Sequence, residues 1–199
     1  MTMLHLGNAL KNPRQAFDEV AKDPPSGARV FFGTGIWLAL CPPLFAFVGT
    51  TLFGWRLGLG PMFLPIDAAL AISAAYFVLL IFGLLSSAFV AHWMAATYGA
   101  DTSYAHSLAL MTLVAVPLAV GSVVHLYPNA FFNVIVLVPT LMWSVYLLYR
   151  GLPIVLRTDP GRGMLMASAL IAYLLVSWVT LLGITAVLWS LGVGPRIAT

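Results

Sequence analysis

Five long runs of apolar residues, separated by short polar connections, occupy most of the chain. Each run approaches or exceeds the roughly 20 residues that an α-helix needs to cross a bilayer core about 30 Å thick. The runs lie at about residues 30–53, 68–97, 107–126, 131–149 and 164–191. This pattern predicts an all-α, polytopic membrane protein, a bundle of five transmembrane helices with its termini on opposite sides of the membrane.

Residues 1–29 are polar, and they contain the start of an additional helix. Asn12 is of a type that caps helices, and Pro13 suits the first helical position. The apolar residues that follow share one helix face: Ala16, Phe17, Val20 and Ala21. We expect a short amphipathic helix that lies along the cytoplasmic membrane surface and ends at residues 23–25. A leader that only sets the topology of the chain explains the segment equally well.

The composition agrees with a membrane location. Hydrophobic residues make up 61% of the 199 positions and charged residues 8%, with a mean hydropathy of +0.99, whereas about a quarter of the residues in a soluble domain are charged. The first run has no small-residue cleavage signal, so we expect it to be retained as a span. We divide the chain into a cytoplasmic amphipathic segment (1–29), a five-helix domain (30–191) and a short tail (192–199).

The basic residues indicate the orientation. Arg56 and Arg196 fall on one side of the expected bundle. Seven others fall on the opposite side: Lys11, Arg14, Lys22, Arg29, Arg150, Arg157 and Arg162. Because Lys and Arg accumulate in cytoplasmic connections, we expect the amino terminus in the cytoplasm and the carboxyl terminus outside. This placement accounts for the net charge of +3, which is therefore no indication of nucleic-acid binding.

The segment at residues 150–162 joins the last two runs and is the best candidate for a surface contact. Arg150, Arg157 and Arg162 would stand near the head groups, where a basic residue contributes about 1 kcal/mol toward binding anionic lipid. Lipid contact is the first hypothesis, and a cytoplasmic protein partner is the second. Aromatic residues near the ends of the runs are expected to form interfacial belts: Trp55, Trp143, Tyr146 and Tyr149.

Four prolines lie inside the apolar runs, at Pro42, Pro43, Pro117 and Pro139. Proline removes a backbone donor and crowds the preceding turn, so we expect helix breaks or kinks at these positions. Ordinary kinks are the favoured interpretation. The alternative is a set of broken helices that line a polar pathway, as in a small transporter, channel or lipid-handling protein.

Small residues recur at every fourth position of the second run, at Gly83, Ser87, Ala91 and Ala95. Such a stripe lets helix backbones approach closely within a membrane. We expect Gly83, Ser87 and Ala91 to pack against another helix. That helix belongs to the same chain in the simpler case, and to a second copy if the protein self-associates.

The sequence contains no familiar catalytic motif. It lacks a His-Glu-x-x-His zinc motif, a Gly-x-Ser-x-Gly elbow and a phosphate-binding loop that ends in Gly-Lys-Ser/Thr. Its single cysteine excludes an intrachain disulfide. Two groups of polar residues remain as candidate sites: Arg56, Asp67 and His125 at the outer ends of the runs, and His92, Asp101 and His106 beside the cytoplasmic turn. Interfacial placement explains both groups, and three ligands are fewer than a structural zinc site uses.

Four segments follow one another in an informative order: NPRQAFDEV at 12–20, AFVGTTLFGW at 46–55, VPLAVGSVVHLYP at 116–128 and YLLYRGLPIVL at 146–156. Together they resemble the Yip family of five-span membrane proteins, in particular its bacterial, YohC-like inner-membrane branch. The resemblance implies the fold and an inner-membrane location. Eukaryotic members are linked to Rab-type GTPases and vesicle traffic, a partner that we do not transfer to a bacterial protein, and the family brings no catalytic motif.

We therefore expect a non-enzymatic membrane organiser or adaptor that uses no cofactor and no metal. Its expected partners are membrane lipids, with a membrane or cytoplasmic protein partner or self-association as further hypotheses. Nucleic acid is not among them. The transporter, channel or lipid-handling protein stays the alternative.

Overall fold

The computed structural model describes residues 6–23, 25–56, 60–100 and 103–190. Within these residues, five helices are long and apolar enough to cross a membrane, which confirms the predicted fold class. The first span joins α3 (Gly27–Val30), a π-helical segment η1 (Phe31–Gly35) and α4 (Ile36–Leu52). The others are α5 (Ile66–Ala95), α6 (Tyr104–Gly121) with the 3₁₀ segment η2 (Ser122–Leu126), α7 (Ala130–Val155) and α8 (Pro160–Ser190).

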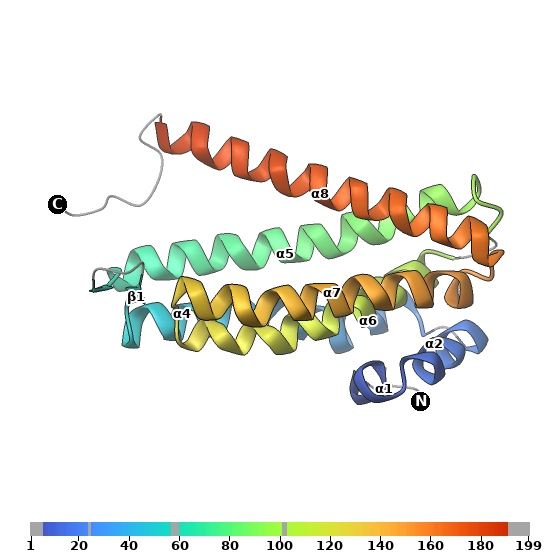
Figure 1. Cartoon of the computed structure of the whole chain (residues 1–199), viewed down its shortest axis with the longest axis horizontal. Coiled ribbons are helices and arrows are strands. Elements are labelled where there is room, and N and C mark those ends of the chain that lie inside the picture. The colour runs from blue at the N-terminus through green and yellow to red at the C-terminus, as the bar shows by residue number, and fades with distance from the viewer. Residues whose placement is uncertain (1–5, 24, 57–59, 101–102, 191–199) are drawn as a thin grey trace.

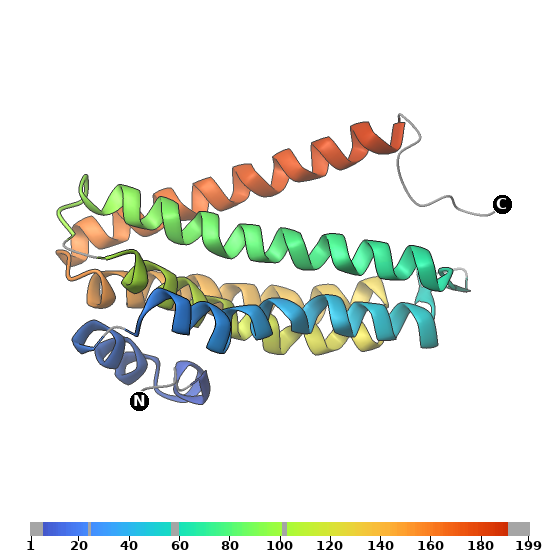
Figure 2. The ribbon, with the colours of Figure 1, turned by 180° about the vertical axis from the view of Figure 1, so that it is seen from behind.

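The bundle has two distinct ends (Figure 1). We call the end that carries the short helices α1 (Leu6–Lys11) and α2 (Pro13–Lys22) the amino-terminal end. The α5–α6 and α7–α8 turns lie at this same end (Figure 2). The opposite, far end carries a small antiparallel hairpin of β1 (Trp55–Arg56) and β2 (Pro61–Met62), together with η2.

Helix α6 lies at the centre of the bundle. It contacts α4, α5 and α7, whereas α8 contacts α7 and α5 and then diverges from the other helices toward the far end (Figure 1). In the most apolar stretch of the α6 span, 67% of the residues are buried, against 6% in α5 and 17% in α8. The protein interior is therefore built around α6, and the outer helices turn most of their surface to the membrane.

The prolines do not interrupt their helices. Helix α4 continues through Pro42 and Pro43, α6 through Pro117, and α7 through both Pro139 and Pro153. A proline keeps a helical φ and deletes one hydrogen bond, and transmembrane helices tolerate that loss. The helices are therefore not broken at these prolines, and the ordinary kinks that we favoured stay a prediction. The irregular segments are η1 and η2, which lie where the first and third spans approach the ends of the bundle.

The continuation of α7 corrects the expected boundary at residue 149. The helix includes Arg150, Gly151 and Pro153, so the connection to α8 shrinks to residues 156–159. Trp143 consequently lies near the middle of α7, and its place in an interfacial belt stays a prediction.

Candidate functional site

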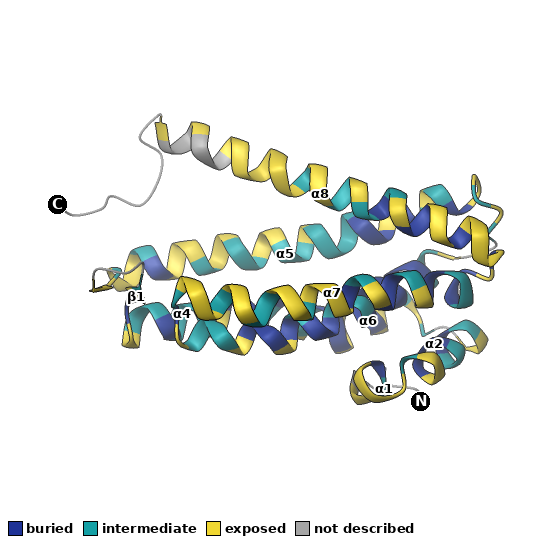
Figure 3. Ribbon diagram, in the orientation of Figure 1, coloured by how far each residue is buried: buried dark blue, intermediate teal, exposed yellow. Residues whose placement is uncertain are grey.

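The two helices before the first span are packed onto the bundle. We call α1 and α2 together the cap. Its apolar side chains are buried against α6 and α7: Ala9, Ala16, Phe17 and Val20. Our expectation that this amphipathic helix lies along the membrane surface is therefore wrong about its contacts, because protein and not lipid covers its apolar face (Figure 3). Sequence periodicity identifies an apolar face but not what covers it.

Phe17 is the anchor of the cap. Its side chain is 0% exposed. A Cβ atom built on Gly151 would lie 2.6 Å from the Phe17 ring and 2.8 Å from the side chain of Leu110. Since real Cβ atoms essentially never approach so closely, only glycine at position 151 lets the ring lie against α7.

Arg157 makes a second connection between the cap and the bundle. One of its guanidinium nitrogens, Nη2, donates a hydrogen bond to the backbone oxygen of Ala21, near the carboxyl end of α2. A cation is favourable there because the last carbonyls of a helix carry partial negative charge. The backbone of Arg157 has a φ of 48°, and the Thr158 N–H bonds the Pro153 oxygen at 3.2 Å. This is a Schellman ending, in which glycine is the usual residue.

The α7–α8 turn is also attached to the α5–α6 turn. The Thr158 hydroxyl donates a hydrogen bond of 2.9 Å to the backbone oxygen of Tyr98. Gly99 has a φ of +68°, and a Cβ atom there would lie 2.7 Å from Arg162 Nη1. Asp159 accepts the Gly161 N–H at 2.9 Å and so caps the start of α8. One short connection thus contacts α2, the α5–α6 turn and α8.

The three arginines that we singled out differ in their surroundings, although all are exposed. Arg150 stands over the ring of Tyr146, with 5.7 Å between its Cζ atom and the ring centroid. Arg157 is engaged with the cap and Arg162 lies against Gly99. The other four basic residues expected at this end are exposed as well: Lys11, Arg14, Lys22 and Arg29.

The small-residue stripe of α5 divides into two parts. Ser87, Ala91 and Ala95 are buried, Ala91 completely. A Cβ atom on Gly83 would have no neighbour within 4 Å. The part of the stripe toward the amino-terminal end therefore packs within this chain, whereas Gly83 faces open space outside the packed interior.

The histidines near the α5–α6 turn make local contacts. The rings of His92 and Tyr104 meet edge to face at 6.2 Å, and His106 Nδ1 lies 3.1 Å from the Ser103 hydroxyl. Asp101, the third residue of that candidate group, lies outside the described residues. Among the residues that the structure describes, there is no group of three or more His, Cys, Asp or Glu that could hold a metal ion.

At the far end, the three residues of the candidate group Arg56, Asp67 and His125 have different surroundings. Arg56 Cζ stands over the ring of Tyr127, 5.0 Å from its centroid. His125 Nδ1 lies 2.6 Å from Asn133 Oδ1. Asp67 is exposed in the first turn of α5. Arg56 is thus held by Tyr127 in the η2–α7 connection, and His125 by Asn133 in the first turn of α7.

The sequence analysis did not identify Tyr127, Asn129 or Asn133 as functional residues. Asn129 is the N-cap residue of α7 and accepts the N–H groups of Phe131 and Phe132. Its position before an apolar run is the signal that could have revealed this role. Asn133 lies one turn further on, inside the run, where its pairing with His125 has no local sequence signature. The Arg56–Tyr127 contact joins residues that only the fold brings together.

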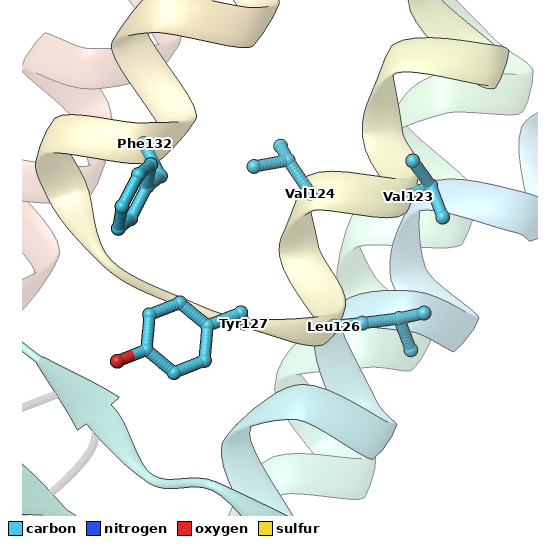
Figure 4. Close-up of a pocket in the computed structure, with 5 residues that line it drawn as sticks. All are labelled: Val123, Val124, Leu126, Tyr127 and Phe132. Atoms are coloured by element: carbon cyan, nitrogen blue, oxygen red, sulfur yellow. The ribbon is translucent and has the colours of Figure 1, made fainter.

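An apolar hollow of about 510 Å³ opens beside these residues. It is lined by Val123, Val124, Leu126, Tyr127 and Phe132. Figure 4 shows Val124 directed toward Phe132, with the Tyr127 ring beside them and its hydroxyl directed toward the β-hairpin. The rings of Tyr127 and Phe132 are 6.0 Å apart. The hollow lies at the end of the bundle and not halfway along it.

Comparison with known proteins agrees with this architecture. The family model described as the Yip1 domain matches residues 7–193. Inner membrane protein YohC of Escherichia coli K12 is 27% identical over 191 residues, which cover 96% of this chain and 98% of the relative. The protein of the same name from E. coli O6:H1 (strain CFT073) matches with the same identity and coverage. No solved structure matches the chain.

Proposed function

The chain belongs to the Yip1 domain family and is a multi-pass inner-membrane protein, and from this premise we propose that it is a non-enzymatic organiser or adaptor. In this proposal the amino-terminal end faces the cytoplasm and receives a protein partner on the cap. The end of α8 lies on the periplasmic side. Arg150 contacts anionic lipid head groups beside the cap.

The observation that carries this proposal is the docking of the cap. A leader that only sets topology acts through the number of its positive charges and needs no tertiary contact. The cap instead buries Phe17 completely and is joined by Arg157 to a turn that lies 136 residues away along the chain. A surface that is already fixed before binding loses less conformational entropy when a partner arrives.

The exposed residues of the cap suit a polar protein surface. Arg14, Lys22 and Asp23 are exposed on α2, and Gln15 bonds Glu19 at 3.1 Å. Arg150 differs because its neighbours on α7, Tyr146 and Trp143, are exposed aromatic rings 5.2 Å apart. Aromatic and basic residues on one exposed helix face favour contact with lipid.

The test is extraction of the protein in native lipid particles, followed by mass spectrometry of the proteins and lipids that accompany it. We expect a stoichiometric protein partner with the wild type. Phe17→Ala should lose this partner because the cap no longer docks. Trp178→Ala, which shortens an exposed aromatic residue on α8, is the matched control and should keep it.

Two results would contradict the proposal that the protein is an adaptor. One is recovery of the same partner with Phe17→Ala, because the docked cap would then be irrelevant. The other is the absence of a stoichiometric protein in every sample, with a specific lipid or small molecule in its place, which would favour the lipid-handling or transport alternative. Protease accessibility of tags at both termini tests the orientation separately.

A further inference from the structure

We propose that the far end binds one anionic phospholipid, with its phosphate on Arg56 and part of an acyl chain in the hollow beside Tyr127. This site lies at the opposite end of the bundle from the cap. It is therefore independent of the proposed adaptor function, and either proposal can fail without the other.

The first argument is the unbalanced charge of Arg56. The Nε atom of its guanidinium is buried and has no hydrogen-bond partner within the part of the chain that the structure describes. No carboxylate among those residues forms an ion pair with it. A buried polar nitrogen of a charged group is costly when it makes no hydrogen bond. An arginine fork pairs well with phosphate oxygens, which makes a phosphate group a suitable partner.

The second argument is the position of the hollow next to that charge. Tyr127 belongs to both features, because its ring lies under Arg56 and also lines the hollow. Every other residue lining the hollow is apolar: Val123, Val124, Leu126 and Phe132. Inorganic phosphate would use the arginine and leave the hollow unfilled, whereas a hydrocarbon would do the reverse. A phospholipid supplies both parts in one molecule.

The site is held in place by contacts that do not involve a ligand. The Arg56 N–H donates to the Pro128 oxygen at 2.9 Å, which fixes the start of the hairpin against the η2–α7 connection. A Cβ atom on Gly49 would collide with the backbone oxygen of His125, so α4 packs directly on η2. The His125–Asn133 pair joins η2 to α7. Because these contacts already fix the elements around the open hollow, less conformational entropy is lost when a lipid binds there.

The occupant should come from the bilayer because of where the hollow lies. The residues that line it belong to the last turns of the third span, the connection that follows, and the first turn of the fourth. The side chains here are largely exposed: Phe131 is 69% exposed, Val123 50% and Phe132 49%. These apolar side chains stand at the level where lipid head groups meet acyl chains, and acyl chains are the apolar groups present there.

The experiment uses the full chain in nanodiscs of phosphatidylcholine, with phosphatidylglycerol added as the anionic probe and retained lipid counted by native mass spectrometry. The wild type should retain one phosphatidylglycerol. Arg56→Gln should weaken retention by about tenfold, the effect of losing one charge-assisted contact. Val124→Phe should weaken it similarly by filling the hollow, while leaving the charge in place. Arg56→Lys should restore part of the binding.

Arg14→Gln is the matched control, because Arg14 is an exposed arginine on α2, at the opposite end of the bundle from the hollow. It should retain phosphatidylglycerol as the wild type does. Equal retention in Arg56→Gln and the wild type, or equal retention of phosphatidylcholine and phosphatidylglycerol, would overturn the proposal. Displacement of the lipid by soluble inorganic phosphate would also overturn it, since that result identifies a site for a soluble anion.

Discussion

The amino-terminal end of the bundle and the far half of α8 show two different uses of apolar residues. At the amino-terminal end, α8 buries Met166, Ala167 and Leu170 completely. Further along the same helix, every residue from 178 to 184 is exposed, on all faces of the helix (Figure 3). One helix is therefore part of the protein interior at its start and surrounded by lipid toward its end.

The difference follows from the solvent at each place. The cap packs beside α6 and α7 at the amino-terminal end of the bundle and exposes charged residues on its other side. Water next to those residues makes the burial of Phe17 favourable. Within the bilayer, lipid tails are as apolar as the side chains, so helices associate through close packing and hydrogen bonds. Ser87, Ala91 and Ala95 allow such packing on α5, and Tyr149 and Ser168 join α7 to α8 at 2.9 Å between their hydroxyl oxygens. The exposed half of α8 consequently needs no protein partner to be stable.

The largest effect that separates the two regions is expected for Phe17→Ala. Deleting a fully buried aromatic side chain costs about 3–5 kcal/mol. We expect most of this loss to appear as undocking of the cap, with the five spans unchanged. Hydrogen exchange should therefore become fast over residues 6–22. Trp178→Ala, in the exposed region, should change neither exchange nor thermal stability, and equal effects of the two substitutions would contradict the comparison.

A single added methyl group at two helical glycines gives a sharper test with a smaller effect. Gly151→Ala places a Cβ atom against Phe17 and Leu110, and overpacking of this kind costs about 1–3 kcal/mol. Gly83→Ala places the same atom in open space, where replacing glycine in a helix is neutral or stabilising by up to about 1 kcal/mol. Thermal unfolding in nanodiscs should shift in opposite directions for the two variants. A loss of stability in Gly83→Ala would indicate that a second copy packs on that part of α5.

Sequence reasoning predicted features that depend on local composition. The five spans follow from length and hydropathy, and Pro13 marks the start of α2 as expected. Asn12 occupies the N-cap position of α2, although its side chain makes no hydrogen bond to the helix. Helix α1 went unnoticed because six residues carry too little periodicity to be distinguished from a loop.

The missed features depend on contacts between distant segments. No local sequence pattern indicates that Phe17 lies on Gly151, or that Tyr127 lies between Arg56 and a hollow. The sequence marks the prolines as positions of a kink or a break, and only the structure shows that the helices continue through them, because the support from neighbouring helices is not visible locally. The positive φ of Arg157 had no local signal either, because glycine is the usual residue at such a helix end and only the fold shows the contact that Arg157 makes with the cap.

The smallest expected effect concerns this arginine, and it requires two variants because two contributions oppose each other. Arg157→Ala removes the bond to Ala21, which contributes about 1 kcal/mol, and keeps a residue with a Cβ atom at φ 48°. Arg157→Gly removes the same bond but relieves about 1 kcal/mol of backbone strain. Both variants should accelerate hydrogen exchange in the cap equally. In thermal unfolding, the glycine variant should be more stable than the alanine variant by about 1 kcal/mol, near the wild type. If the two variants unfold alike, the strained backbone at this turn stores no free energy, and Arg157 was retained for its contact with the cap alone.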